Sequence, residues 1–192
     1  DGTIDFSSAD DNWPQISHYY PVGFYTLRYT ATGPSGCTST HLYSVFVGSE
    51  PAVALGTPGN TSGCAPRTLT FSISGIQDNI QGTTYIVDYG DGSPTETLSH
   101  PPPGSVTHTF EESSCGNTFQ TYNNAFGVTI TATNPCGEST GTVSPIRISE
   151  PPTAGMSITP QTICVNQSAL INSTADPGTS ASNGGCTSTS LL

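Results

Sequence analysis

Short motifs in this chain occur twice, and the second copy follows the first after about 100 residues. Ser49-Glu50-Pro51 returns as Ser149-Glu150-Pro151, and Cys64 returns as Cys164. This period is too long for one turn of a solenoid, but it is the usual size of a small β-sandwich domain. The chain is therefore expected to consist of similar modules in series.

Further correspondences fix the register of the repeat. Residues 17–20 correspond to residues 107–110, and residues 29–33 correspond to residues 130–134. Asp1-Gly2-Thr3 matches the second half of Asp88-Tyr89-Gly90-Asp91-Gly92-Ser93, so we expect the chain to open within a module.

Prolines mark the expected borders between modules. A proline follows a strand pattern at three positions: Pro51, Pro151 and Pro152. Proline has no backbone N–H to donate, and just past the end of a strand this removes no hydrogen bond of the sheet. We predict three parts: the C-terminal part of one module at residues 1–50, a complete module at 51–150, and the N-terminal part of a further module at 151–192.

Hydrophobic and polar residues alternate along the chain, which is the pattern of a half-buried β-strand. The alternation runs through residues 25–32, 43–47, 69–73, 126–133 and 146–148. Turn sequences at residues 33–36 and 134–137 are expected to join strands as hairpins. Residues 176–190 have the Ser, Thr, Gly and Asn content of a flexible loop. No window has the period of a long amphipathic helix, so the predicted fold class is all-β.

Composition excludes several classes of protein. The chain carries three Arg, no Lys and a net charge of −11, whereas nucleic-acid binding requires a basic surface. No apolar run reaches the ~18 residues of a membrane-spanning helix in this segment. The chain has six cysteines, and none of their spacings is that of a zinc knuckle. They indicate disulfides instead, and disulfides predict an exported protein that is secreted or held at the cell surface. The six cysteines are Cys37, Cys64, Cys115, Cys136, Cys164 and Cys186.

Residue patterns typical of catalysis are absent from the sequence. His41 and His100 have no acid or nucleophile at a recognisable spacing, and no nucleophile-elbow or zinc-protease motif occurs. Cys115 follows His108 closely, but a disulfide accounts for it better than a nucleophile does. We expect no enzymatic activity. The single tryptophan, Trp13, lies in a loop, where it would pack against protein or stack on a sugar ring.

Three ordered motifs resemble the PKD domain, an immunoglobulin-like sandwich of bacterial surface proteins, secreted enzymes and polycystin. They are Val87-Asp88-Tyr89-Gly90-Asp91-Gly92, His108-Thr109-Phe110, and the strand at residues 126–134. The resemblance implies tandem immunoglobulin-like antiparallel β-sandwiches. One departure is Val87, because the family usually has a buried Trp there, so other side chains must fill that part of the core.

The resemblance implies a structural role for the turn formed by Asp88, Gly90, Asp91 and Gly92. Its carboxylates are expected to accept hydrogen bonds from backbone N–H groups, with His108 packed nearby. A calcium site at Asp88 and Asp91 is the alternative, although they supply two carboxylates where calcium takes about six to eight oxygen ligands. No other cofactor is expected.

An immunoglobulin-like strand order would place the loops of Cys64 and Cys115 at one end of the sandwich and Cys136 at the other. The leading hypothesis is therefore a Cys64–Cys115 bond. The alternative is a bridge from Cys115 or Cys64 to Cys186 in the next module. Two cysteine positions recur between modules, which also suits such bridges: Cys37 and Cys136 occupy one, and Cys64 and Cys164 the other.

The function that the resemblance implies is a structural or adhesive stalk in a large exported repeat protein, such as the adhesins of gliding bacteria. The expected partners are neighbouring repeats, other copies in a filament, or cell-surface polysaccharide. The alternative is an accessory spacer, or a carbohydrate-contacting module, of a secreted glycosidase or protease.

Overall fold

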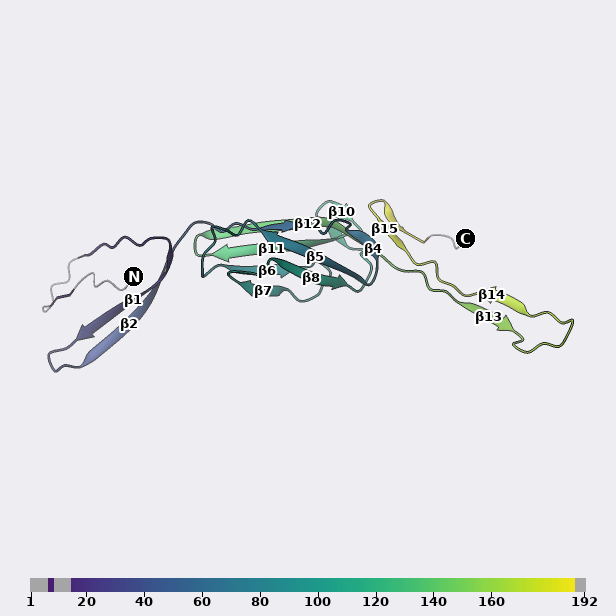
Figure 1. Ribbon diagram of the computed structural model, residues 1–192, viewed down its shortest axis with the longest axis horizontal. Helices are drawn as coiled ribbons and strands as arrows, with labels where there is room; N and C mark the ends of the chain where they lie inside the picture. Colours follow the sequence, from purple (N-terminus) through teal and green to yellow (C-terminus); the bar gives the residue numbers. More distant parts are fainter. Residues whose placement is uncertain (1–6, 9–14, 189–192) are drawn as a thin grey trace.

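The computed structural model describes residues 7–8 and 15–188. All regular secondary structure in these residues is β-strand, which confirms the predicted all-β class. A central sandwich is flanked by hairpins at its two ends, so the described part of the molecule is elongated (Figure 1). No helix in these residues has the length and hydrophobicity needed to cross a membrane.

The central sandwich has two sheets. The larger has the order β4-β12-β11-β6-β7, with bounds Ser62–Cys64, Gly137–Ser149, Phe126–Asn134, Thr84–Asp88 and Glu96–Ser99. The smaller has the order β3-β5-β8, with bounds Ala54–Gly56, Arg67–Ser74 and Ser105–Phe110. Neighbouring strands are antiparallel, except for the parallel pair of β4 and β12. This arrangement is an immunoglobulin-like sandwich.

Strand β5 shows how alternation builds the core. Leu69, Phe71 and Ile73 point inward and are buried, whereas Thr68 and Thr70 face outward. Each outward threonine forms a hydroxyl–hydroxyl hydrogen bond with a threonine of β8, at 2.8 Å and 2.9 Å. The core cluster draws on both sheets, and its members lie between Val53 and Ile148 in the sequence.

Val87 stands where the resemblance calls for a buried Trp. It is fully buried, and the aromatic side chains of the core lie at Tyr85, elsewhere on β6, and on other strands. Phe110 of β8 stacks on Phe126 of β11 with ring centroids 5.4 Å apart, and Phe71 of β5 is also fully buried.

Tyr85 of β6 is the largest fully buried side chain, and its hydroxyl has two partners. Asn79 donates to it from Nδ2 at 2.8 Å, and the Nδ1 atom of His100 lies 2.9 Å away. Asn79 also accepts from the N–H of Ala52 and donates to its carbonyl. This network holds the segment at Ala52, where the chain enters the sandwich, against Tyr85 of β6.

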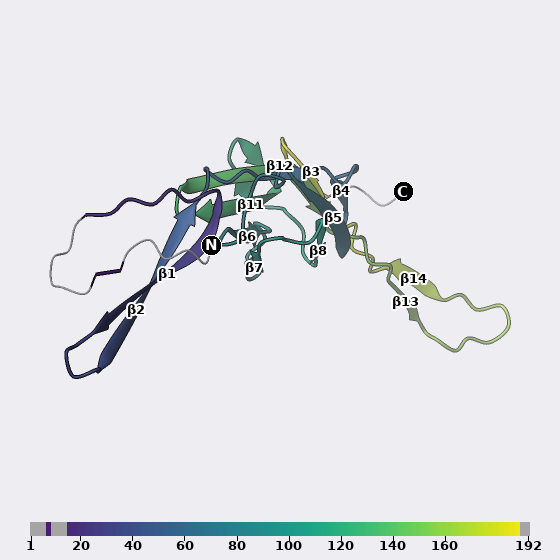
Figure 2. The ribbon, with the colours of Figure 1, turned by 60° about the vertical axis from the view of Figure 1, so that its left-hand side comes forward.

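Hairpins flank the sandwich at both ends (Figure 2). On the N-terminal side β1 (Gly23–Thr32) pairs with β2 (Thr38–Val47). On the C-terminal side β13 (Met156–Thr159) pairs with β14 (Leu170–Ser173), and β15 (Ser180–Ser182) with β16 (Gly185–Thr187). The prediction of a flexible loop at 176–190 is therefore wrong for residues 180–187, which form a hairpin. The loop between β8 and β11 contains a short hairpin of β9 (Thr118–Phe119) and β10 (Tyr122–Asn123).

Candidate functional site: the two ends of the sandwich

The Asp-Gly turn follows β6 and is held by its own side chains. Asp88 accepts the N–H of Gly90 at 2.8 Å. Gly90 has φ of +69°, and a β-carbon there would lie 2.5 Å from the carbonyl oxygen of Gly127. Gly92 also has a positive φ, of +86°. Because only glycine adopts this backbone at low cost and leaves room for β11, the motif specifies the turn.

Asp91 attaches this turn to β8. Its Oδ1 atom accepts from the N–H and the hydroxyl of Ser93, and its Oδ2 atom lies 2.7 Å from Nε2 of His108. The His108 ring stacks on Tyr89 at 3.9 Å and meets Phe110 edge-on at 4.9 Å. Burial raises the pKa of Asp91, but hydrogen bonds from Ser93 and His108 outweigh it and hold the pKa below its usual value. The turn and β8 thus form one polar cluster.

This polar cluster does not have the arrangement of a catalytic triad. A triad needs the nucleophile hydroxyl on the histidine, whereas the hydroxyl of Ser93 donates to Asp91. Within residues 7–8 and 15–188, no three His, Cys, Asp or Glu side chains cluster as metal ligands. Asp88 and Asp91 both accept hydrogen bonds from protein groups. The calcium site stays a prediction.

The structure contains one disulfide, between Cys115 and Cys186, with the two Cα atoms 5.8 Å apart. The leading hypothesis of a Cys64–Cys115 bond is therefore wrong. The alternative, a bridge from the sandwich to the segment after it, is what the structure shows. The other cysteines are free and exposed: Cys37, Cys64, Cys136 and Cys164.

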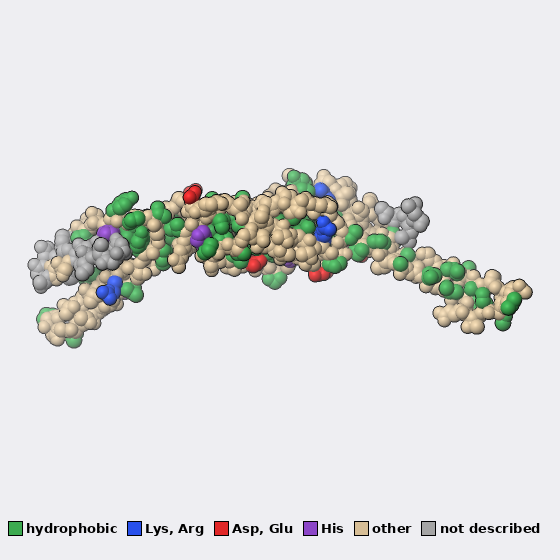
Figure 3. Space-filling view, viewed as in Figure 1, with side chains coloured by type: hydrophobic (Ala, Val, Ile, Leu, Met, Phe, Trp, Pro, Cys, Tyr) green, Lys and Arg blue, Asp and Glu red, His purple; other side chains and the backbone are tan. Residues whose placement is uncertain are grey.

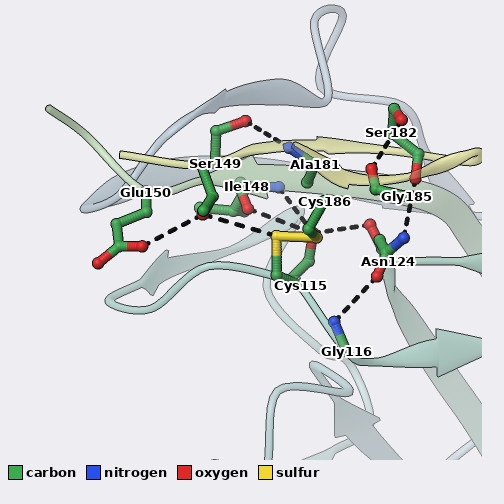
Figure 4. Close-up of a disulfide and its surroundings, with 12 residues drawn as sticks. Cys115, Gly116, Asn124, Ile148, Ser149, Glu150, Ala181, Ser182, Gly185 and Cys186 are labelled. Atoms are coloured by element: carbon green, nitrogen blue, oxygen red, sulfur yellow. Dashed lines mark hydrogen bonds between the residues drawn. A yellow bond between two sulfur atoms is a disulfide. The ribbon is translucent and has the colours of Figure 1, made fainter. Parts of the chain in front are cut away.

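Ser114 explains why Cys115 faces the C-terminal segment. It is fully buried, and its Oγ atom donates to the carbonyl of Asn124 and accepts from the N–H of Ile148. Its own N–H donates to the carbonyl of Ile148 at 2.8 Å. These bonds tie the loop between β8 and β11 to the end of β12. Cys115 follows directly and meets Cys186 of β16 (Figure 4).

Backbone hydrogen bonds continue the contact past the end of β12. The N–H of Glu150 donates to the carbonyl of Thr179, and the reverse bond also forms, at 2.8 Å and 3.3 Å. Thr153 and Asp176 exchange two bonds of 2.9 Å. The linker between the sandwich and the C-terminal segment is therefore a paired ladder.

Side chains add to this contact (Figure 4). Asn124 donates from Nδ2 to the carbonyl of Ser182 at 3.0 Å, and Ser149 accepts from the N–H of Ala181 at 3.0 Å. We call the whole set, with the disulfide and the ladder, the C-terminal junction.

At Gly178, the two backbone segments of the C-terminal junction lie in close contact. Gly178 has φ of +67°, and a β-carbon there would overlap the carbonyl oxygen of Glu150. Its N–H donates to the side chain of Asp176 at 2.8 Å. Glycine is required here because the two backbones approach so closely.

The N-terminal end of the sandwich has a different contact, made by aromatic side chains. Phe24 of β1 and Phe46 of β2 are paired across the hairpin, and a β-carbon on Gly82 would lie 3.4 Å from both rings. A β-carbon on Gly48 would lie 3.2 Å from Cδ1 of Ile80.

The turn between β11 and β12 also reaches the linker that joins β2 to β3. Asn134 donates from Nδ2 to the carbonyl of Ser49 at 3.0 Å, and Sγ of Cys136 lies 3.4 Å from the carbonyl of Gly48. We call these contacts, with the two phenylalanines, the N-terminal junction.

The residues that the sequence singled out lie in several parts of the molecule. The turn residues and His108 meet at one polar cluster. Cys115 and Cys186 belong to the C-terminal junction and Cys136 to the N-terminal junction. Cys64 lies on β4, and Cys37 and Cys164 lie between the strands of the outer hairpins. Trp13 lies outside the described residues, so its contact with glycan stays a prediction. Nothing in the sequence indicates the roles of Asn79 and Ser114, because residue type alone does not reveal burial.

No family model matches the chain, and no curated protein does. Among solved structures it is similar to the FN1–FN3 domains of chicken CNTN1. The identity is 13%, the match covers 85% of this chain and 72% of that one, and the TM-score is 0.27. The immunoglobulin-like assignment of the central sandwich rests on its own sheet order.

Proposed function

We propose that this chain is a stalk segment of an exported repeat protein. Its PKD-like modules would bear tension between a cell surface and the object that the protein attaches to that surface. The module borders are those marked by Pro51 and Pro151. The PKD assignment is supported by the Asp-Gly turn, by the contact of Asp91 with His108, and by the order of the three motifs.

The C-terminal junction is the observation that carries this proposal. A flexible spacer would need no contact between its modules, because Ser- and Gly-rich linkers separate domains on their own. Here a ladder, side-chain bonds and a disulfide join the sandwich to the following segment. The N-terminal junction lies at the opposite end, so the contacts follow the long axis of the molecule (Figure 1).

The disulfide gives tension a covalent route. Force that enters the sandwich can pass through Cys115 to Cys186, which leaves the linker and the β13–β14 hairpin outside the loaded path. The bridged residues are separated by 71 positions. Such a bond persists in oxidising compartments, which favours an extracellular location.

Single-molecule stretching tests the proposal. The chain is held by its two ends, with and without reductant. We expect reduction to add about 23–26 nm of contour length, because 71 residues are released at ~3.3–3.6 Å each. The double variant Cys115→Ser with Cys186→Ser is the control and should not respond to reductant. Equal contour lengths before and after reduction would refute a load-bearing role for the junction.

A further inference from the structure

The β15–β16 hairpin turns through Asn183 and Gly184, and Asn183 joins this turn to the sandwich. Its Oδ1 atom accepts from the N–H of Asn123 on β10 and from Nη2 of Arg147 on β12, both at 3.3 Å. Both partners are donors only, so the oxygen of the amide, and not its nitrogen, must face them. The two contacts hold the side-chain carbonyl of Asn183 against the sandwich.

Arg147 has a donor that Asn183 does not satisfy. Its Nε atom is buried and has no hydrogen-bond partner among the described residues, and no described carboxylate forms an ion pair with it. A buried donor normally has a partner. The Nε and Nη2 donors of a planar guanidinium point the same way, as in the two-bond contact of arginine with a carboxylate. An amide offers one oxygen to these two donors, whereas a carboxylate offers two.

Gly184 is placed to convert that amide into a carboxylate. Asn183 and Gly184 are both exposed, so water reaches the turn. Among the described residues, none accepts a hydrogen bond from the N–H of Gly184 or from Nδ2 of Asn183. A β-carbon on Gly184 would meet only the hydroxyl of Ser182, at 4.0 Å, so no side chain crowds the turn there. The nitrogen that would attack the amide and the nitrogen that would leave it are therefore both free.

We propose that Asn183 is a modification site, at which the side-chain amide is replaced by a carboxylate that pairs with Arg147. The backbone nitrogen of Gly184 bonds to Cγ of Asn183 and gives its proton to water. The bond between Cγ and Nδ2 breaks, and Nδ2 takes a proton and leaves as ammonia. Negative charge collects on Oδ1 during the attack, where Arg147 and the N–H of Asn123 stabilise it. This modification goes beyond the stalk proposal and does not depend on it.

Water then opens the cyclic imide that the attack leaves. Addition at Cγ breaks its new bond to nitrogen and gives aspartate at position 183, whereas addition at the main-chain carbonyl gives isoaspartate with a longer backbone. The ladder at Thr179 and the disulfide of Cys186 hold the chain on both sides of the turn, which favours the product of unchanged backbone length. Cations are scarce in this chain, which has three arginines and no lysine, and basic side chains are few in Figure 3. A carboxylate at position 183 therefore gains its partner from Arg147.

Ageing of the folded and the unfolded chain tests the site. Trypsin releases the fragment 148–192, which holds Asn183 together with Asn166 and Asn172 as internal references. Tandem mass spectrometry locates the mass gain that accompanies loss of an amide. We expect position 183 to react at least about threefold faster in the folded chain than in the reduced chain in urea, because only the folded chain places donors on Oδ1. An equal or slower reaction in the folded chain would overturn the proposal.

Arg147→Met tests whether the guanidinium supplies this effect. Methionine keeps an unbranched apolar side chain but has no donor, and protection of the Ile130 amide reports that the sandwich is folded. We expect the rate at position 183, measured in the fragment 68–192, to fall to the value of the unfolded chain. Arg28→Met is the matched control, because it changes an exposed arginine of β1 and should leave the rate unchanged. An unchanged rate in Arg147→Met would overturn the assignment.

Asn183→Asp supplies the product directly and tests the pairing. The amide of Ala181 donates to Ser149 within the C-terminal junction. We expect this amide to exchange about two- to fivefold more slowly than in the freshly prepared natural chain, the range for a partly exposed ion pair, and the gain should vanish when Arg147→Met is added. Asn172→Asp is the matched control, because it adds the same charge to β14 and should leave the exchange unchanged. Unchanged or faster exchange in Asn183→Asp would overturn the proposal.

Discussion

Asp91 is the residue that attaches the turn after β6 to strand β8. Its side chain is 13% exposed and bonds Ser93 through one oxygen and His108 through the other. Asp91→Ala removes both contacts, and we expect it to lower the free energy of unfolding by about 1.5–3 kcal/mol, the range for hydrogen bonds to charged groups. Urea denaturation measures this. Asp88→Ala removes one bond at an exposed site and should cost less than about 1 kcal/mol. Equal losses would contradict this role of Asp91.

The same carboxylate makes a prediction for pH. The hydrogen bonds lower the pKa of Asp91 in the folded state below its ordinary value of 3.8. A group of this kind contributes stability above its unfolded pKa and loses that contribution as pH falls through its folded pKa. The stability difference between the natural chain and Asp91→Ala should therefore be constant above about pH 5 and shrink below about pH 4. Urea titrations across this range measure it, and a difference that grows towards acid would contradict it.

Several residues of the core network have no signal in the sequence. Asn79 and His100 surround the hydroxyl of Tyr85, and Ser114 ties a loop to β12. Burial of a polar side chain depends on partners far away in the chain, and composition or spacing does not report it. The glycines of the Asp-Gly turn were predictable because their positive φ is a local requirement.

At the scale of elements, Gly178 decides whether the C-terminal junction forms. Gly178→Ala should open the ladder, because the new methyl group overlaps the carbonyl of Glu150 and φ is +67°. We expect hydrogen exchange at the amide of Thr179 to rise at least about tenfold, while that of Ile130 in the sandwich stays unchanged. Gly184→Ala is the control, since its β-carbon would meet only the hydroxyl of Ser182, at 4.0 Å. Unchanged protection at Thr179 would contradict the importance of this approach.

Alternation predicted the strands. β5 and β11 follow the expected residues closely and bury one face, as a period of two indicates. β1 also follows the expected residues, although none of its side chains is fully buried. Residues 180–187 were misread, because Ser, Gly and Asn are common both in flexible loops and in tight hairpins. Pairing with the sandwich, through Ser149 and Asn124, decides between these two outcomes.

At the scale of the whole molecule, the repeat predicted the sandwich but not how its ends are joined. The Cys64–Cys115 hypothesis assumed that loops at one end of a sandwich face each other. In the structure, Ser114 and Asn124 direct the loop towards the next segment, and Cys64 sits beside Ser149. Such orientation arises from contacts between modules, which a pattern within one module does not contain.

Non-reducing peptide mapping tests the covalent junction most directly. The chain has three arginines and no lysine, so trypsin yields few fragments that contain cysteine: 29–67, 68–147 and 148–192. Free thiols are blocked before digestion. The structure predicts that 68–147 is linked to 148–192 through Cys115 and Cys186, and that 29–67 is released with Cys37 and Cys64 both blocked. A link between 29–67 and 68–147 would contradict the junction on which the stalk proposal depends.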